Sequence, residues 1–179
     1  LRADGAELER VVEPPPSRPQ IVAVIHLDAS KGLSEAAPAR VELRMHGDAA
    51  AGFRQVAARA PREDLERTFR QAFSSTYSWI ELDRVIWESR PDDNSFSLVM
   101  TGKAEVEWRE NPDLGVREFK LPGAGGGVAA YPRREPGPNR EAPYAVAYPT
   151  FRESVTEVVL PGGGRGFTIR GPNADQSIG

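Results

Sequence analysis

SFSLVMTGKAEVEW, residues 95–108, decides the fold, because its side chains alternate between apolar and polar along nearly the whole stretch. Apolar residues and one glycine, Gly102, occupy the even positions, and only Val99 places an apolar side chain among the polar odd positions. A period of two predicts a β-strand with one face against a core and the other toward solvent. Roughly 14 residues at about 3.3 Å each make a long strand, so Gly102 predicts a bend or a bulge.

Three further segments predict strands that pair with this one. Residues 21–27, IVAVIHL, form a β-branched run that predicts a strand buried on both faces or nearly so. Residues 40–46 alternate strictly and predict a half-buried strand, after a loop that Pro38 punctuates. Residues 79–88 return to strand chemistry, and the turn cluster PDDN at 91–94 predicts a hairpin into the stretch quoted above.

Two consecutive helices are predicted between these strands. Residues 49–58 are rich in alanine, and a second run, residues 61–75, begins with a proline, which the first helical position tolerates. Leu65, Phe69 and Phe73 recur at helical spacing in the second run. We therefore expect this apolar face to pack on the sheet.

The composition bounds the function classes. The chain has 179 residues, of which 39% are hydrophobic and 27% charged, which is enough apolar material for one core. Charged residues, Gly or Pro interrupt every apolar run before the ~20 residues that a membrane helix needs. The net charge of -3 gives no protein-wide basic field for nucleic acid. The absence of cysteine excludes disulfides, thiolate metal sites and cysteine nucleophiles.

The order of these segments predicts the domain organisation and the fold class. Residues 1–19 contain three consecutive prolines and predict a linker from a preceding domain, and residues 20–179 predict a single β-rich domain. A Pro/Gly-rich loop is expected at 110–143. Shorter strands are predicted at 116–121, 144–148, 152–160 and 166–170. The predicted fold is α+β, a mostly antiparallel β sheet or sandwich with one or two helices packed on it.

The sequence offers little for enzymatic catalysis. A Ser-His-Asp relay needs an imidazole, and His26 and His46 both lie in predicted strands, with no Gly-x-Ser-x-Gly turn in the chain. Paired carboxylates for glycoside hydrolysis would have to come from different strands. The candidates are Glu105, Glu107, Glu153 and Glu157. Their alternation favours solvated sheet surface, so a carboxylate-based hydrolase is the least favoured function and no catalytic residue is predicted.

No metal or cofactor site is predicted either. Two histidines 20 positions apart, without His-x-His or cysteine, do not make a ligand set. The acidic cluster 92–94 lacks the alternation of a calcium loop and favours a hairpin turn. The glycine runs 123–127 and 162–166 lack the Gly-Lys-Ser/Thr of a phosphate loop and favour turns.

One loop carries a candidate binding site. Basic and aromatic side chains are interleaved within its proline-rich sequence, a composition suited to an anionic or carbohydrate partner. The candidate residues are Tyr131, Arg133, Arg134, Arg140 and Tyr144. The competing interpretation is an ordinary solvated loop.

The order of elements, with several short motifs, resembles a known family. The motifs are Leu1 to Gly5 with Leu8, the strand and helix entry Val41 to Phe53, Arg140 to Tyr144, and Val158 to Gly162. Together they resemble the non-catalytic β-rich domain, a domain of unknown function, that follows the core of bacterial multidomain transglutaminase-like proteins.

This resemblance implies a non-enzymatic accessory role in a periplasmic or otherwise extracytoplasmic protein. Its partner would be a transglutaminase-like core of the same polypeptide, which uses Cys, His and Asp and which this domain would shape or dock. The resemblance carries no catalytic residue, cofactor or metal to this chain. The alternative is an independent carbohydrate- or peptide-binding module of the cell envelope.

Overall fold

The computed structural model of this chain describes residues 14, 16–32, 34–119 and 151–169. The predicted strand at 144–148 and the five candidate binding residues between Tyr131 and Tyr144 lie outside this part, as does most of the predicted linker. Within it, no helix is long and apolar enough to cross a membrane.

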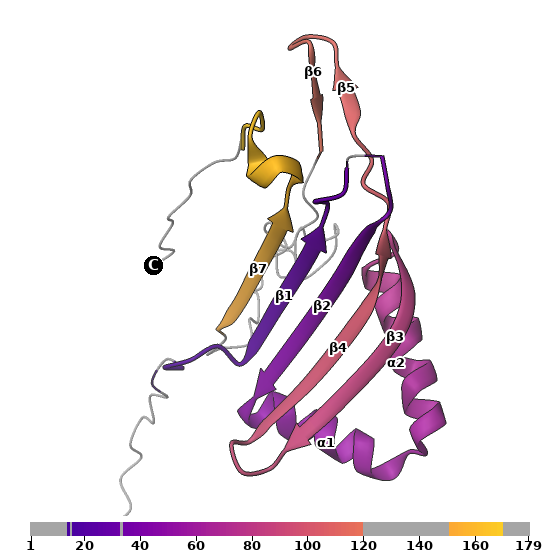
Figure 1. Cartoon of the computed structure of the whole chain (residues 1–179). Helices are drawn as coiled ribbons and strands as arrows, with labels where there is room; N and C mark the ends of the chain where they lie inside the picture. Colours follow the sequence, from indigo (N-terminus) through magenta and orange to yellow (C-terminus); the bar gives the residue numbers. More distant parts are fainter. Residues whose placement is uncertain (1–13, 15, 33, 120–150, 170–179) are drawn as a thin grey trace, which may run out of the picture.

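A five-stranded sheet forms the body of the domain (Figure 1). Its strands lie in the order β3-β4-β2-β1-β7, and all neighbours are antiparallel except β1 and β7, which are parallel. The bounds are β1 Ile21–Asp28, β2 Ala37–His46, β3 Ile80–Arg90, β4 Ser95–Ala104 and β7 Arg152–Val159. A separate hairpin pairs β5 Arg109–Asn111 with β6 Val116–Glu118, and a short helix, η1 Pro161–Gly164, follows β7.

Two helices cover one face of the sheet, α1 Gly47–Arg59 and α2 Arg62–Thr76 (Figure 1). The side chains between helices and sheet form the core, and the predicted face of the second helix is buried there: Leu65, Phe69 and Phe73. The α+β fold with a mostly antiparallel sheet and packed helices is therefore confirmed. In the described part, a layer of two helices covers one face of the sheet, and no second large sheet packs against it.

Aromatic rings join α2 to the sheet. The ring of Phe69 meets Trp87 of β3 edge to face, with centroids 5.3 Å apart, and lies 6.5 Å from Phe96 of β4. The guanidinium of Arg62 lies 4.5 Å from the centre of the Trp87 ring, a cation–π geometry. Phe53 of α1 reaches Phe96 at 5.6 Å, so both helices are held to the same strand.

Gly102 marks the irregularity that the sequence predicts, although the bulge lies on the neighbouring strand. The register between β3 and β4 shifts between Leu82 and Arg84, opposite Gly102 and Thr101. A Cβ at position 102 would meet the Glu81 carbonyl oxygen at 2.2 Å, so only glycine fits.

The β3–β4 turn also has the predicted form. Asn94 has a positive φ of 52°, which asparagine tolerates better than most residues. The Asp93 carboxylate accepts hydrogen bonds from the Ser95 backbone N–H at 3.0 Å and from its hydroxyl at 2.5 Å. The acidic cluster thus folds the turn, and the described residues hold no group of three or more His, Asp or Glu suited to a metal.

Four sequence predictions about strands need correction. The stretch 95–108 is a strand only to Ala104, and the chain leaves the sheet before β5. Pro38 belongs to β2 rather than to a loop: it lies opposite Lys103 of β4, just beyond Ala39, the last residue of β2 that pairs with β1. Residues 166–169 form no strand, because Gly166 has a φ of 83°. In β1 buried residues alternate with partly exposed ones, since no helix of the described residues covers the second face.

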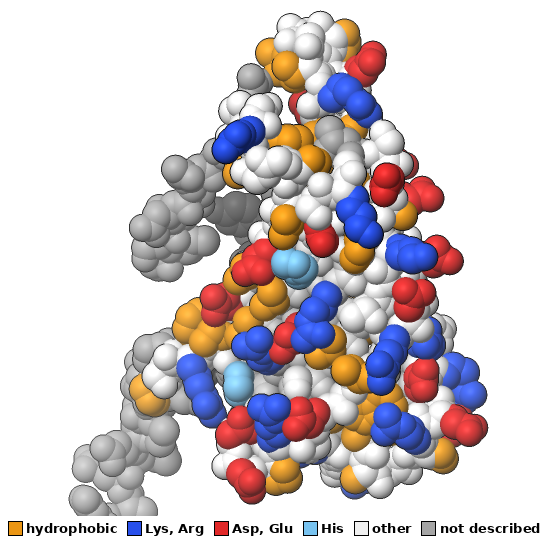
Figure 2. Space-filling view, in the orientation of Figure 1, with side chains coloured by type: hydrophobic (Ala, Val, Ile, Leu, Met, Phe, Trp, Pro, Cys, Tyr) orange, Lys and Arg blue, Asp and Glu red, His pale blue; other side chains and the backbone are white. Residues whose placement is uncertain are grey.

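We call the side of the sheet that carries no helix in the described part of the chain the open face. Its side chains lie in rows that cross the strands, since the registers place residues of neighbouring strands side by side. One row is largely apolar and runs from β3 to β7: Ile86, Val99, Glu42, Val24 and Val155. Figure 2 shows basic and acidic side chains alternating over this face, with apolar patches between them.

Candidate binding cleft

A cleft of about 780 Å³ lies where one end of the sheet meets the β5–β6 hairpin. Its walls come from the segment before β2, the entry to β3, the end of β4 and both strands of the hairpin. The lining residues are Ala36, Ser78, Trp79, Ile80, Glu81, Lys103, Glu105, Glu107, Arg109, Glu118 and Phe119. This volume lies within the range of roughly 300–1,000 Å³ that is usual for ligand pockets.

The exit of the chain from β4 creates this cleft. After Ala104 the polar odd positions continue, so Glu105 and Glu107 stay exposed while the backbone leaves the sheet. Gly115, with a φ of 61°, allows the tight turn of the hairpin. The hairpin then returns to place Glu118 and Phe119 across from β4.

An aromatic cluster holds the base of the hairpin. Trp108 lies 5.6 Å from Phe119 and 5.8 Å from Phe167, measured between ring centroids. Phe167 follows η1, so the segment after β7 contacts the hairpin through Trp108. Because three rings anchor it, the wall formed by Phe119 has a defined position relative to the sheet.

The cleft carries more negative than positive charge. Four glutamates line it against one lysine and one arginine, which leaves an excess of two negative charges. Arg109 lies 3.4 Å from Glu107, and Asn111 donates a hydrogen bond to Glu118 at 3.1 Å. Within the described residues Glu105 has neither an ion pair nor a hydrogen bond, so its carboxylate is available to a ligand.

The structure separates the candidate carboxylates of the sequence. Glu105 and Glu107 line the cleft, whereas Glu153 and Glu157 lie on β7, at the far edge of the sheet from β3. Trp79 is partly buried against the core and also lines the cleft. Sequence reasoning missed this cleft: the polar alternation continues past Gly102 to Glu107, but nothing in it indicates that Trp79 and Phe119 lie nearby.

The two histidines lie on the open face and far apart. His26 pairs with Arg40 in the sheet register, so His46 is six positions further along β2, about 20 Å away at ~3.4 Å per residue. His26 Nδ1 lies 3.3 Å from Glu157 Oε2, and both side chains are substantially exposed. These contacts are those of an ordinary surface pair.

His46 lies beside a serine and an aspartate, yet their bonds differ from those of a catalytic relay. Ser95 is opposite His46 in the register, and its hydroxyl donates directly to Asp93. These hydrogen bonds from Ser95 lower the pKa of Asp93. His46 Nδ1 is buried without a hydrogen-bond partner. In a relay the imidazole lies between the hydroxyl and the carboxylate, so this group stabilises the turn instead.

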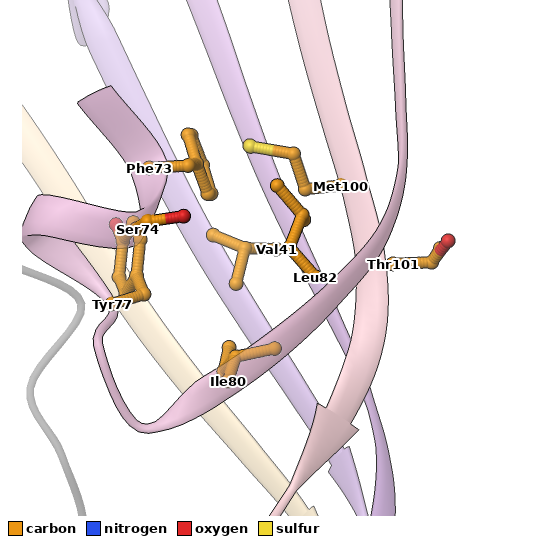
Figure 3. A pocket seen from close by; sticks show the side chains of 8 residues that line it. All are labelled: Val41, Phe73, Ser74, Tyr77, Ile80, Leu82, Met100 and Thr101. Atoms are coloured by element: carbon orange, nitrogen blue, oxygen red, sulfur yellow. The ribbon is translucent and has the colours of Figure 1, made fainter. Parts of the chain in front are cut away.

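A second cavity lies between α2 and the sheet (Figure 3). Val41, Phe73 and Met100 are among its lining side chains, and its volume is only about 10 Å³. This is close to the smallest space that holds one water molecule. It is a packing gap of the core, and the cleft beside the hairpin is the better candidate site.

The chain was compared with protein-family models, with curated proteins and with solved structures. No family model, curated protein or solved structure matches it.

Proposed function

We propose that this chain is a non-enzymatic binding module whose ligand, a peptide or a carbohydrate, occupies the cleft beside the β5–β6 hairpin. The observation that carries the proposal is the cleft itself. It combines about 780 Å³ of space with two aromatic side chains, Trp79 and Phe119, and six charged ones. Six of its eleven lining residues are charged, so the cleft is more polar than a typical small-molecule pocket and favours a polar or charged ligand.

The exposure of the carboxylates supports binding over hydrolysis. The Glu107 side chain is 72% exposed and pairs with Arg109. A general acid in glycoside hydrolysis is kept protonated by apolar surroundings that exclude water. The exposed Glu107 side chain lacks such surroundings. Exposed carboxylates instead suit reversible hydrogen bonds and ion pairs with a ligand.

Chemical-shift mapping by NMR tests this function. The probes are an N-acetylglucosamine hexamer and a hexalysine peptide, added separately to the ¹⁵N-labelled chain. We expect at least one probe to shift the amides of cleft residues selectively, and the double variant Glu105→Gln with Glu118→Gln to weaken that binding. Shifts that spread over the open face, or no shifts with either probe, would contradict the proposal.

A second candidate function follows from the resemblance and from the open face. As this second candidate, we propose that the chain is a periplasmic accessory domain that docks a transglutaminase-like core of the same polypeptide. The supporting observation is the apolar row across the open face, in which Ile86 is 40% exposed. Flat faces with apolar side chains among charged ones are typical of interfaces between domains.

Hydrogen exchange distinguishes this second candidate. The experiment compares this chain alone with the full polypeptide that would contain the core, in the wild type and in an Ile86→Arg variant. Docking predicts slower exchange of β3 and β4 in the full polypeptide, and loss of that protection in the variant. A matched control is Glu110→Arg on the hairpin, which lies away from the row. Equal exchange in both contexts would refute docking through the open face.

A further inference from the structure

The charge distribution in the cleft narrows the class of ligand, if the proposed binding function holds. Of the two cationic side chains, Arg109 pairs with Glu107 and also lies directly across from Glu118 in the register of β5 and β6, and Lys103 lies directly across from Glu81 in the register of β3 and β4. Among the described residues Glu105 therefore has no cation partner, and Glu118 shares Arg109 with Glu107. A ligand that enters the cleft meets an excess of negative charge, which favours a positively charged group.

The aromatic walls favour the same kind of ligand. Trp79 and Phe119 both line the cleft. The faces of aromatic rings attract ammonium and guanidinium groups, and tryptophan does so most strongly. Lysine and arginine also have aliphatic stems that pack on apolar surface while the charged head reaches a carboxylate. A polyanionic sugar would be repelled by the glutamates.

The edge of the sheet adds a place for an extended backbone. Within the described residues, β3 is an edge strand, and its first residues Ile80 and Glu81 line the cleft. An extended peptide adds to such an edge through backbone hydrogen bonds. The Ile80 N–H already donates to the Tyr77 carbonyl at 2.9 Å, and at the bulge the Arg70 guanidinium donates to the Asp83 carbonyl at 2.8 Å, so only backbone groups between these two bonds remain for a ligand. The usable edge is therefore short and lies at the cleft.

From the acidic excess, the two rings and this edge, we propose that the cleft binds an extended polypeptide segment rich in lysine or arginine. The segment would place its cationic side chains against Glu105 and Glu118, with their stems over Trp79 and Phe119. Because the charges are exposed, the binding is expected to weaken as salt rises.

Isothermal titration calorimetry with hexalysine, hexaglutamate and the N-acetylglucosamine hexamer tests this proposal on the whole chain. We expect hexalysine alone to bind, and its affinity to fall between about 50 and 300 mM salt. Glu105→Gln with Glu118→Gln should weaken hexalysine binding about tenfold. The matched control is Glu110→Gln with Glu153→Gln, which removes the same charge at two exposed positions outside the cleft and should leave affinity unchanged.

The outcomes separate this inference from the proposed function. If the sugar hexamer binds in the cleft and hexalysine does not, the cationic ligand is wrong and the binding module stands. If hexalysine binds equally to both double variants, the interaction is a general effect of the net charge and the inference is refuted. If no probe binds, both the inference and the proposed cleft function fail.

Discussion

Replacement of Gly102 by alanine is the sharpest test of the sheet geometry. Gly102 lies in β4 between two partners, with Ala39 of β2 on one side and Leu82 of β3 on the other. A methyl group there would meet the Glu81 carbonyl oxygen at 2.2 Å and Ile80 Cγ2 at 2.9 Å. The first distance is about 1 Å or more shorter than two such atoms tolerate.

The magnitude follows from which atoms can move. The Ile80 side chain can change rotamer, but the Glu81 carbonyl belongs to the backbone of a paired strand and cannot rotate away. The strands must separate or the bulge must shift, which breaks ladder hydrogen bonds. Overpacking costs typically 1–3 kcal/mol and occasionally more, so we expect Gly102→Ala to lower the free energy of unfolding by about 3 kcal/mol. For a chain of this size that corresponds to a fall in Tm of roughly 6–12 °C.

A glycine-to-alanine substitution in α1 provides a control, because it should raise the free energy of unfolding instead of lowering it. Gly52 lies within α1, and a Cβ there would meet nothing within 4 Å. Alanine is favoured over glycine in a helix by up to about 1 kcal/mol, so Gly52→Ala should raise stability. Urea unfolding followed by far-UV circular dichroism measures both variants. If Gly102→Ala is as stable as Gly52→Ala, with equal denaturant slopes, the close approach of β3 and β4 at the bulge is refuted.

Three further predictions test the core, the open face and the attachment of β7. Phe69→Asp should cost about 3 kcal/mol or more, because Phe69 is only 5% exposed, and an unchanged Tm would contradict the packing of α2. The hydrogen bond from Arg44 holds the pKa of Glu42 below its usual value near 4.5, so its stabilising contribution is present above pH 4.5 and lost as pH falls through the lower folded pKa. Wild type should therefore lose more unfolding free energy than Glu42→Gln between pH 5 and pH 2, and parallel pH profiles would refute this. Glu157→Gln removes an exposed pair with His26 and should change stability by less than about 1 kcal/mol at pH 6; a larger loss in thermal unfolding would show that the pair holds β7.

Period and turn chemistry were sufficient to predict most of the sheet and both helices. The alternation in residues 95–104 predicts which side of β4 is buried, because a strand with one solvated face must alternate. The spacing of Leu65, Phe69 and Phe73 predicts which face of α2 is buried, because residues four positions apart lie on the same side of a helix. The turn at Asp93 and Asn94 was predictable because its hydrogen bonds are local.

The errors in strand ends arise where non-local pairing overrides the local pattern. Polar alternation continues through Glu105 and Glu107, yet β4 ends at Ala104 because β3 begins at Ile80, its register partner. Nothing in the residues after Ala104 records where the partner begins. For the same reason Pro38 looked like a loop residue, since its place in β2 depends on the pairing with β4, in which it lies opposite Lys103.

The cleft could not be predicted from the sequence because its walls meet only in the folded chain. Trp79, Glu105 and Phe119 come from three segments, and each alone is typical of an ordinary sheet end or turn. The predicted site relied instead on residues that are close in sequence, from Tyr131 to Tyr144, which lie outside the described part of the chain. Those residues remain a prediction.

The arrangement around Glu42 bears on how a partner could use the open face. Glu42 is the one charged residue in the apolar row, and Arg44 donates to it at 2.6 Å and Arg40 at 3.0 Å, both from its own strand. A partner that covers the row therefore buries the Glu42 carboxylate together with the guanidinium groups of Arg40 and Arg44. Because two positive charges face one negative charge, one positive charge is left without compensation. Desolvation of such charges can exceed the gain from their attraction. The proposed docking through the open face would therefore be weak and reversible, whereas in the proposed cleft site Glu105, which has no ion pair among the described residues, would gain an ion partner from a cationic ligand.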